Sequence, residues 1–257
     1  MRIINSIFIA FSMFSRIPSP NVVWSKSNMK YAMCAFPLVG AVIGALLFAL
    51  TWVCGKFSVS PIISAALLTA LPVIITGGIH LDGFCDTVDA LSSRAPAEKK
   101  REILKDPRCG AFAVIWVCVY MITYFALSSQ LAFDLIGILP VAIMFVLSRS
   151  LSGLCVTLMS TSSSKGLADT FQRLASKKAV CTVLIIFIVV SSAALIFTGT
   201  LRGGFMLLAA LLCVLRLCYI AKKEFGGMSG DLAGYFLQIC ELSMLFAFVL
   251  SDILLTA

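Results

Sequence analysis

Seven long apolar runs dominate this sequence of 257 residues. They cover roughly residues 31–54, 59–79, 110–130, 135–155, 179–199, 204–221 and 233–256, and each can cross a bilayer as a helix. Charged residues make up only 12%, whereas a soluble domain uses about a quarter to cover its surface. Because backbone in hydrocarbon must satisfy its own hydrogen bonds, and no run alternates like a barrel strand, the sequence predicts an all-α polytopic membrane bundle.

A shorter apolar stretch, Ile3 to Phe14, precedes the first long run. We expect it to form a short amphipathic helix that is retained in the protein, because no small-residue cleavage site follows it. No internal repeat or low-complexity linker divides the chain. We therefore expect a single transmembrane catalytic domain over residues 1–257.

The basic residues are distributed very unevenly among the loops. All but four of the 20 Lys and Arg residues lie in the N-terminal segment or in alternate loops; Lys56 and Arg202 lie in the opposite loops, and Arg149 and Arg216 within runs. The positive-inside rule predicts that the basic loops face the cytoplasm. The net charge of +8 thus reflects topology and contact with the lipid bilayer, and we expect no nucleic-acid partner.

Three aspartates follow the second run in the segment Gly77 to Asp89. Asp82, Asp86 and Asp89 stand at positions i, i+4 and i+7, which places their carboxylates on one face of a helix. Like charges on one strip repel each other unless a cation lies among them. Mg²⁺ prefers carboxylate oxygens together with the oxygens of a substrate diphosphate. The spacing therefore indicates a Mg²⁺ site that handles a diphosphate, with a solvated acidic face as the alternative.

The same loop continues with Lys105, Asp106 and Arg108, which stand directly before the third run. Basic side chains on the same side of the membrane as the aspartates can bind phosphate oxygens, and Arg can do so with two hydrogen bonds. We assign all three residues to substrate binding. A role in topology alone is the alternative, and it is more credible for Lys99, Lys100 and Arg101.

The last basic loop is rich in glycine and leads into a fourth acidic group. Gly226 and Gly227 allow the backbone to turn tightly and to approach a ligand, and Ser229 and Asp231 follow them. We assign Asp231 to the catalytic group and the other three residues to substrate binding.

Two ionisable residues lie inside predicted spans. Glu241 stands two to three turns into the last run, and Arg149 lies near the basic end of the fourth. Ionisable residues at that depth are functional candidates by default, and we assign both to substrate binding. A buried ion pair that holds the bundle together is the alternative.

Together these motifs resemble the adenosylcobinamide-GDP ribazoletransferase (cobalamin synthase) family. The run Gly-Gly-Ile-His-Leu-Asp-Gly-x-x-Asp-Thr-x-Asp at 77–89 is its specific signature. Weaker segments in the same order complete the resemblance over nearly the whole chain; these are 16–20, 36–40, 105–110, 148–149, 165–168 and 226–234. Ser229 stands where the family usually has threonine, Pro107 where it has serine, and Gln238 where it has glutamate. The last change puts a metal role for that helix in doubt.

The resemblance implies a joining reaction. Adenosylcobinamide-GDP and α-ribazole, or its 5′-phosphate, give adenosylcobalamin, or its 5′-phosphate, and GMP, with Mg²⁺ as the cofactor. Asp82, Asp86 and Asp89 would hold the metal, with one of the three as the candidate to accept the hydroxyl proton, and Asp231 would complete the site. Arg108 and Arg149 would bind the diphosphate. Arg16 and His80 join the substrate-binding set, although a continuous helix would point His80 away from the aspartates.

The resemblance also implies a multi-pass protein of the bacterial or archaeal cytoplasmic membrane with its active-site loops on the cytoplasmic side. The oligomeric state is left open. One alternative is a CDP-alcohol phosphotransferase-like enzyme, although its Asp-x-x-Asp-Gly-x-x-Ala-Arg pattern is not matched here. A polytopic transporter is the other, but it would place its acidic residues deep in the spans, whereas here most lie in loops.

Overall fold

The computed structural model describes residues 2–131, 134–162 and 166–256, and the regular secondary structure of these parts is helical, apart from an isolated bridge between Thr161 and Met228. Lys165, which begins the segment 165–168 of the family resemblance, lies outside the described residues. The all-α prediction is confirmed.

Six helices of the described chain are long and apolar enough to cross a membrane. They are α3 (Phe36–Lys56), α7 (Ala111–Ser128), α8 (Leu139–Leu158), α10 (Lys177–Gly199), α11 (Leu201–Glu224) and α12 (Gly230–Thr256). A seventh candidate is a bent pair, in which α4 (Pro61–Thr76) and α5 (Ile79–Ser92) meet at 93°. The predicted number of spans is confirmed when this pair is counted as one.

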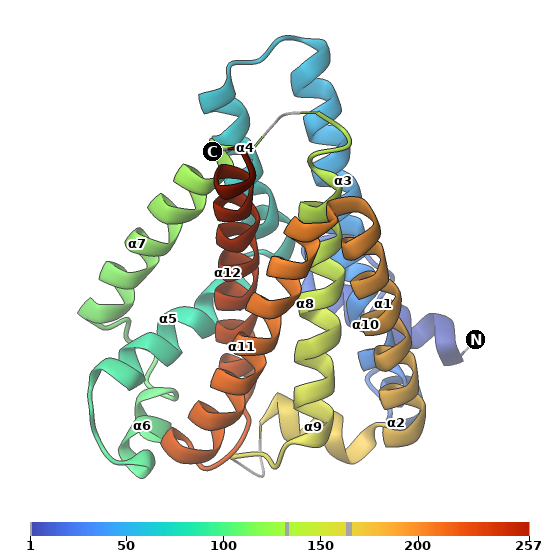
Figure 1. Ribbon diagram of the computed structural model, residues 1–257. Coiled ribbons are helices and arrows are strands. Elements are labelled where there is room, and N and C mark those ends of the chain that lie inside the picture. The colour runs from blue at the N-terminus through green and yellow to red at the C-terminus, as the bar shows by residue number, and fades with distance from the viewer. Residues whose placement is uncertain (1, 132–133, 163–165, 257) are drawn as a thin grey trace.

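The remaining helices are short. They are α1 (Arg2–Phe14), α2 (Lys26–Met29), the 3₁₀ helix η1 (Ala32–Ala35), α6 (Ala97–Ile103) and α9 (Leu167–Leu174). The expected apolar N-terminal helix is thus present as α1. In Figure 1, α2, α6 and α9 lie together at the lower end of the bundle, which we call the basic end.

Helix α8 forms the centre of the bundle. In its most apolar 18-residue stretch 72% is buried, compared with 22% in the corresponding stretches of α7 and α10. Gly40 and Gly44 of α3 pack directly on it. A Cβ added at Gly40 would lie 2.2 Å from the carbonyl oxygen of Phe145, and one at Gly44 would lie 2.6 Å from that of Ala142. The Gly-x-x-x-Gly spacing of these two residues thus allows the two helix backbones to approach closely.

Candidate active site

The site begins at the elbow between α4 and α5. Gly77 and Gly78 have φ angles of 65° and 79°, in the left-handed region that glycine adopts without steric cost. Arg16 covers this elbow: its backbone N–H donates to the carbonyl of Ile75 at 2.7 Å, and a Cβ at Gly77 would lie 2.6 Å from the Arg16 Cγ. The segment 16–20 of the family resemblance therefore lies against the start of the aspartate motif.

Beyond the elbow, α5 crosses α12 at two glycines. A Cβ at Gly83 would lie 2.8 Å from the carbonyl oxygen of Asp231, and one at Gly234 would lie 2.9 Å from that of His80. Larger residues at this crossing would push the helices apart. The crossing brings the start of the aspartate motif beside Asp231, although about 150 residues separate them in the sequence.

Helix α5 runs unbroken from Ile79 to Ser92, so the helical spacing of the three aspartates is confirmed. Asp82 is exposed, Asp86 is partly buried, and Asp82, Asp89 and Asp231 all interact unfavourably with a negative charge on Asp86. Among the described residues, no ion pair involves any of these four carboxylates. The structure therefore gathers negative charge without neutralising it.

Asp89 lies at the far end of the motif, against the start of α7. Gly110 is the N-cap of α7, and a Cβ there would lie 2.1 Å from both carboxylate oxygens of Asp89. Glycine is thus required to admit this carboxylate to the helix N-terminus, where the helix dipole favours negative charge.

Two adjoining cavities open beside the aspartates. An outer cavity of about 520 Å³ at the basic end is lined by polar residues that include Arg101, Lys105 and Ser229. An inner cavity of about 300 Å³ is lined mainly by apolar and aromatic residues, with His80 and Asp82 in its wall. Leu167, Ala168, Gly230 and Asp231 line both cavities, so Asp231 stands at the boundary between them.

The glycine-rich loop builds one wall of the outer cavity. Gly226 has a φ of 70°, and a Cβ at Gly227 would lie 2.5 Å from the backbone N of Ser162. Met228 pairs with the neighbouring chain, because its N–H donates to the carbonyl of Ser160 at 2.7 Å. The hydroxyl of Ser229 then accepts from the N–H of Leu232 at 3.2 Å and caps α12, which fixes the position of Asp231.

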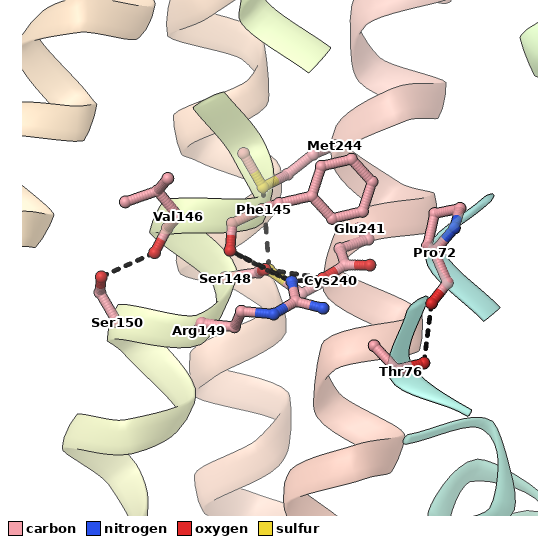
Figure 2. Close-up of polar contacts among 10 residues, drawn as sticks. All are labelled: Pro72, Thr76, Phe145, Val146, Ser148, Arg149, Ser150, Cys240, Glu241 and Met244. Atoms are coloured by element: carbon pink, nitrogen blue, oxygen red, sulfur yellow. Dashed lines mark hydrogen bonds and ion pairs between the residues drawn. The ribbon is translucent and has the colours of Figure 1, made fainter. Parts of the chain in front are cut away.

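Arg149 and Glu241 form an ion pair inside the bundle, at 1% and 2% exposure (Figure 2). The guanidinium donates to Glu241 Oε1 at 2.7 Å and to the carbonyl of Phe145 at 3.1 Å, and the Ser148 hydroxyl donates to the same carboxylate oxygen at 2.8 Å. The two residues thus pair with each other, as their opposite charges suggested.

The basic loop residues fall into two groups. Arg101 donates to the carbonyl of Phe225 at 3.0 Å, and the buried Lys100 pairs with Glu224, so both hold α6 against the end of α11. Arg108 is exposed and binds Asp106 with two side-chain hydrogen bonds of 2.9 and 2.7 Å. These bonds lower the pKa of Asp106 to about 2. Topology alone therefore does not account for Lys100 and Arg101.

Sequence reasoning missed Ser152 and three phenylalanines, Phe14, Phe36 and Phe171, all of which line the inner cavity. Ser152 follows the Ser148-Arg149 pair by one helical turn on a largely apolar helix, which is a readable signal. The phenylalanines come from α1, α3 and α9, and nothing in the sequence indicates that these helices meet.

The carboxylates of this site fit Mg²⁺ as part of its ligands, with the remaining ligands to come from substrate and water. Among the described residues, no group of three His, Cys, Asp or Glu side chains could hold a metal ion as it stands. Mg²⁺, however, is usually held by one or two carboxylates and completed by substrate phosphates and water. Asp82, Asp86 and Asp231 supply hard oxygen atoms near one another on two helices.

Comparison with known proteins gives a consistent result. A family model described as cobalamin-5-phosphate synthase matches residues 6–249. An adenosylcobinamide-GDP ribazoletransferase of Lachnoclostridium phytofermentans is 44% identical over 98% of this chain and 96% of its own. Enzymes of the same name from Clostridium perfringens and Clostridium botulinum are 36% identical over 92% of this chain and 94% of theirs, and 33% identical over 94% and 95%. No solved structure matches.

Proposed function

Because this chain belongs to the cobalamin-5-phosphate synthase family, it is an adenosylcobinamide-GDP ribazoletransferase of cobalamin biosynthesis, and we propose how its residues carry out that reaction. Family membership sets aside both the CDP-alcohol phosphotransferase and the transporter alternatives. The observation that carries the proposal is the meeting of Asp82 and Asp231, from α5 and α12, on the wall of one cavity without a cationic partner in the described chain.

The diphosphate of adenosylcobinamide-GDP binds in the outer cavity. Lys105 and Arg101 line this cavity and supply positive charge to phosphate oxygens. Arg108, which the sequence assigned to the diphosphate, lies outside the residues that line it and is bound to Asp106. We therefore give the leading phosphate contact to Lys105, and keep Arg108 and Asp106 as residues at the entrance.

Asp82, Asp86 and Asp231 would hold Mg²⁺, and Asp89, which lies against Gly110, would add negative charge to the same helix face. When bound, the metal neutralises the carboxylates and the charge that develops on the phosphoryl oxygens. This role explains why the fold tolerates four acidic groups that repel one another.

The chemistry requires a ribose hydroxyl of the ribazole to attack the phosphorus that bears the cobinamide. A new P–O bond forms, the bond to the GMP oxygen breaks, and the hydroxyl proton leaves with a base. We assign Asp231 to accept this proton, and the support is its position where the two cavities meet. Positioning and electrostatic stabilisation supply most of the rate acceleration in such transfers.

Arg149 and Glu241 act as positioning residues in this proposal. Both are buried and paired with each other, although the Arg149 Nε has no hydrogen-bond partner among the described residues, and this pairing leaves no net side-chain charge for a diphosphate. Arg149 lies on α8 and Glu241 on α12, so their bond fixes the helix that carries Asp231. Arg16, Gly226 and Gly227 likewise set the geometry of the elbow and of the loop.

We also propose that the basic end faces the cytoplasm of the bacterial cell. The support is the charge asymmetry of the loops together with the position of α2, α6 and α9 at one end (Figure 1). Both cavities would then be reached from the cytoplasmic side.

The test is release of GMP from adenosylcobinamide-GDP and α-ribazole 5′-phosphate by the purified protein in liposomes. We expect turnover that stops on chelation and returns with Mg²⁺, and that is lost in Asp82→Asn. Asp252→Asn, at the opposite end of α12, is the matched control and should remain active. Turnover that persists after complete chelation would refute the metal assignment, and a folded wild type that releases no GMP would refute the reaction.

A further inference from the structure

The inner cavity contains two polar groups that the fold leaves unpaired. His80 and Ser152 line it at 5% and 0% residue exposure, and neither the imidazole Nε2 of His80 nor the hydroxyl of Ser152 makes a hydrogen bond within the described part of the chain. Buried polar groups almost always have a partner, because losing water without replacement destabilises the fold. Two such groups on residues that line one cavity point to a ligand that supplies the partners.

The neighbouring Ser150 shows that the unpaired hydroxyl is not a general property of α8. Its hydroxyl donates to the carbonyl of Val146 one turn earlier, at 2.6 Å (Figure 2). Serine in a helix commonly makes this bond, and Thr157 makes it too, at 2.7 Å to Gly153. Ser152 does not, although a carbonyl one turn earlier is equally near along the chain.

The walls of the inner cavity are aromatic. The Phe14 ring lies 4.4 Å from that of Phe36 and 6.1 Å from that of Phe171, measured between centroids, and the Phe36 ring lies 5.8 Å from the His80 imidazole. Aromatic faces and edges of this kind bind a flat heteroaromatic ring by stacking and edge contacts. The volume of about 300 Å³ suits a small bicyclic base.

We propose that the inner cavity binds the aromatic base of the ribazole, with the Ser152 hydroxyl donating to its unsubstituted ring nitrogen and His80 Nε2 facing the ribose. This inference rests on the proposed function and gives the binding site of one of its two substrates, the ribazole. The base lies between Phe14, Phe36 and Phe171, and the ribose hydroxyls lie at Asp82 and Asp231. A 5′-phosphate then reaches the outer cavity.

The other parts of the substrates do not suit this cavity. A corrin ring is too large for about 300 Å³. Guanine carries donors and acceptors around most of its edge, and the apolar walls would leave several of them unpaired. A benzimidazole-type base has a single unsubstituted ring nitrogen and an otherwise apolar edge, which matches the one hydroxyl of Ser152.

The kinetic test compares Ser152→Ala with Ser150→Ala in liposomes. We expect Ser152→Ala to raise the KM for α-ribazole 5′-phosphate about ten-fold, the effect of one lost hydrogen bond, with the KM for adenosylcobinamide-GDP unchanged. Ser150→Ala, whose hydroxyl is satisfied within the helix, should change neither constant. Phe171→Leu should weaken binding of α-ribazole more than binding of the analogue that carries imidazole in place of its base. The smaller imidazole has less ring area to stack on Phe171, so it loses less when that ring is removed.

Calorimetric binding of α-ribazole to the intact protein, without the donor substrate, separates this proposal from the reaction itself. Binding that weakens in Ser152→Ala supports the base site even if the wild type released no GMP. The proposal is overturned if Ser152→Ala and Phe171→Leu leave α-ribazole binding unchanged. It is also overturned if they raise the KM for adenosylcobinamide-GDP alone, since the cavity would then belong to the donor.

Discussion

The ion pair of α8 and α12 and the aspartates of α5 and α12 hold charge in opposite ways. Arg149 and Glu241 meet at 2.7 Å and neutralise each other inside the bundle. Asp82, Asp86 and Asp231 lie near one another without a cation among the described residues, and their charges are unfavourable to each other. Helix α12 carries a member of each group, so one helix serves both arrangements.

The difference teaches which charges serve the fold and which serve the reaction. A buried pair that is satisfied internally contributes little net stability but becomes costly when one partner is removed. Like charges held together destabilise the fold until a ligand arrives, so their retention indicates binding or catalysis. The two regions should therefore respond to substitution in opposite ways.

The largest effect is expected at the aspartates. Asp82→Asn and Asp231→Asn should each lower kcat by about 100-fold or more, because the charge-stabilising groups at the reacting phosphate are lost. Their thermal unfolding temperature should be unchanged or raised, since repulsion is relieved. GMP release and unfolding of the same preparations measure both. A clear fall in unfolding temperature would show that these carboxylates support the fold instead.

The ion pair should show the reverse pattern. Glu241→Gln leaves Arg149 buried without a counter-charge and should lower the free energy of unfolding by about 3–5 kcal/mol. The double substitution Arg149→Met with Glu241→Leu removes both charges and should recover most of that loss. Denaturation in detergent follows both proteins. If Glu241→Gln were as stable as the wild type but unable to bind adenosylcobinamide-GDP, the pair would belong to the substrate site.

The sequence predicted the spans and the helical aspartate motif, because each depends on hydropathy or local spacing. The ion pair of Arg149 and Glu241 was only the alternative to their assignment to substrate binding. The inner cavity was not predictable in this way. Its walls come from α1, α3, α5, α8, α9 and α12, and the phenylalanines there look like ordinary apolar residues in the sequence. That residues 1–257 form one domain stays a prediction.

A smaller effect is expected at Gly110, which admits the Asp89 carboxylate. The backbone there, with φ −80° and ψ 162°, suits alanine, so only the added methyl group matters. Gly110→Ala should displace Asp89, lower kcat/KM about ten-fold and destabilise the fold by about 1–3 kcal/mol. Gly204→Ala is the control, because nothing lies within 4 Å of its added Cβ in α11, and it should be as stable as the wild type or more so. Equal behaviour of the two variants would exclude a special role for the Asp89 contact.

The smallest effects are expected at two basic side chains of the basic end. One of them already has an acidic partner, and the other is available to a ligand. Lys105 lines the outer cavity, whereas Arg108 is exposed and bound to Asp106. Lys105→Gln should raise the KM for adenosylcobinamide-GDP about ten-fold, the effect of one charge-assisted hydrogen bond to phosphate. Arg108→Gln should change that KM by about two-fold or less and leave the unfolding temperature unaltered, because exposed pairs contribute little. Kinetics at constant ionic strength separate the two. A larger effect at Arg108 would mean that it leaves Asp106 for the diphosphate when substrate binds, as the sequence first suggested.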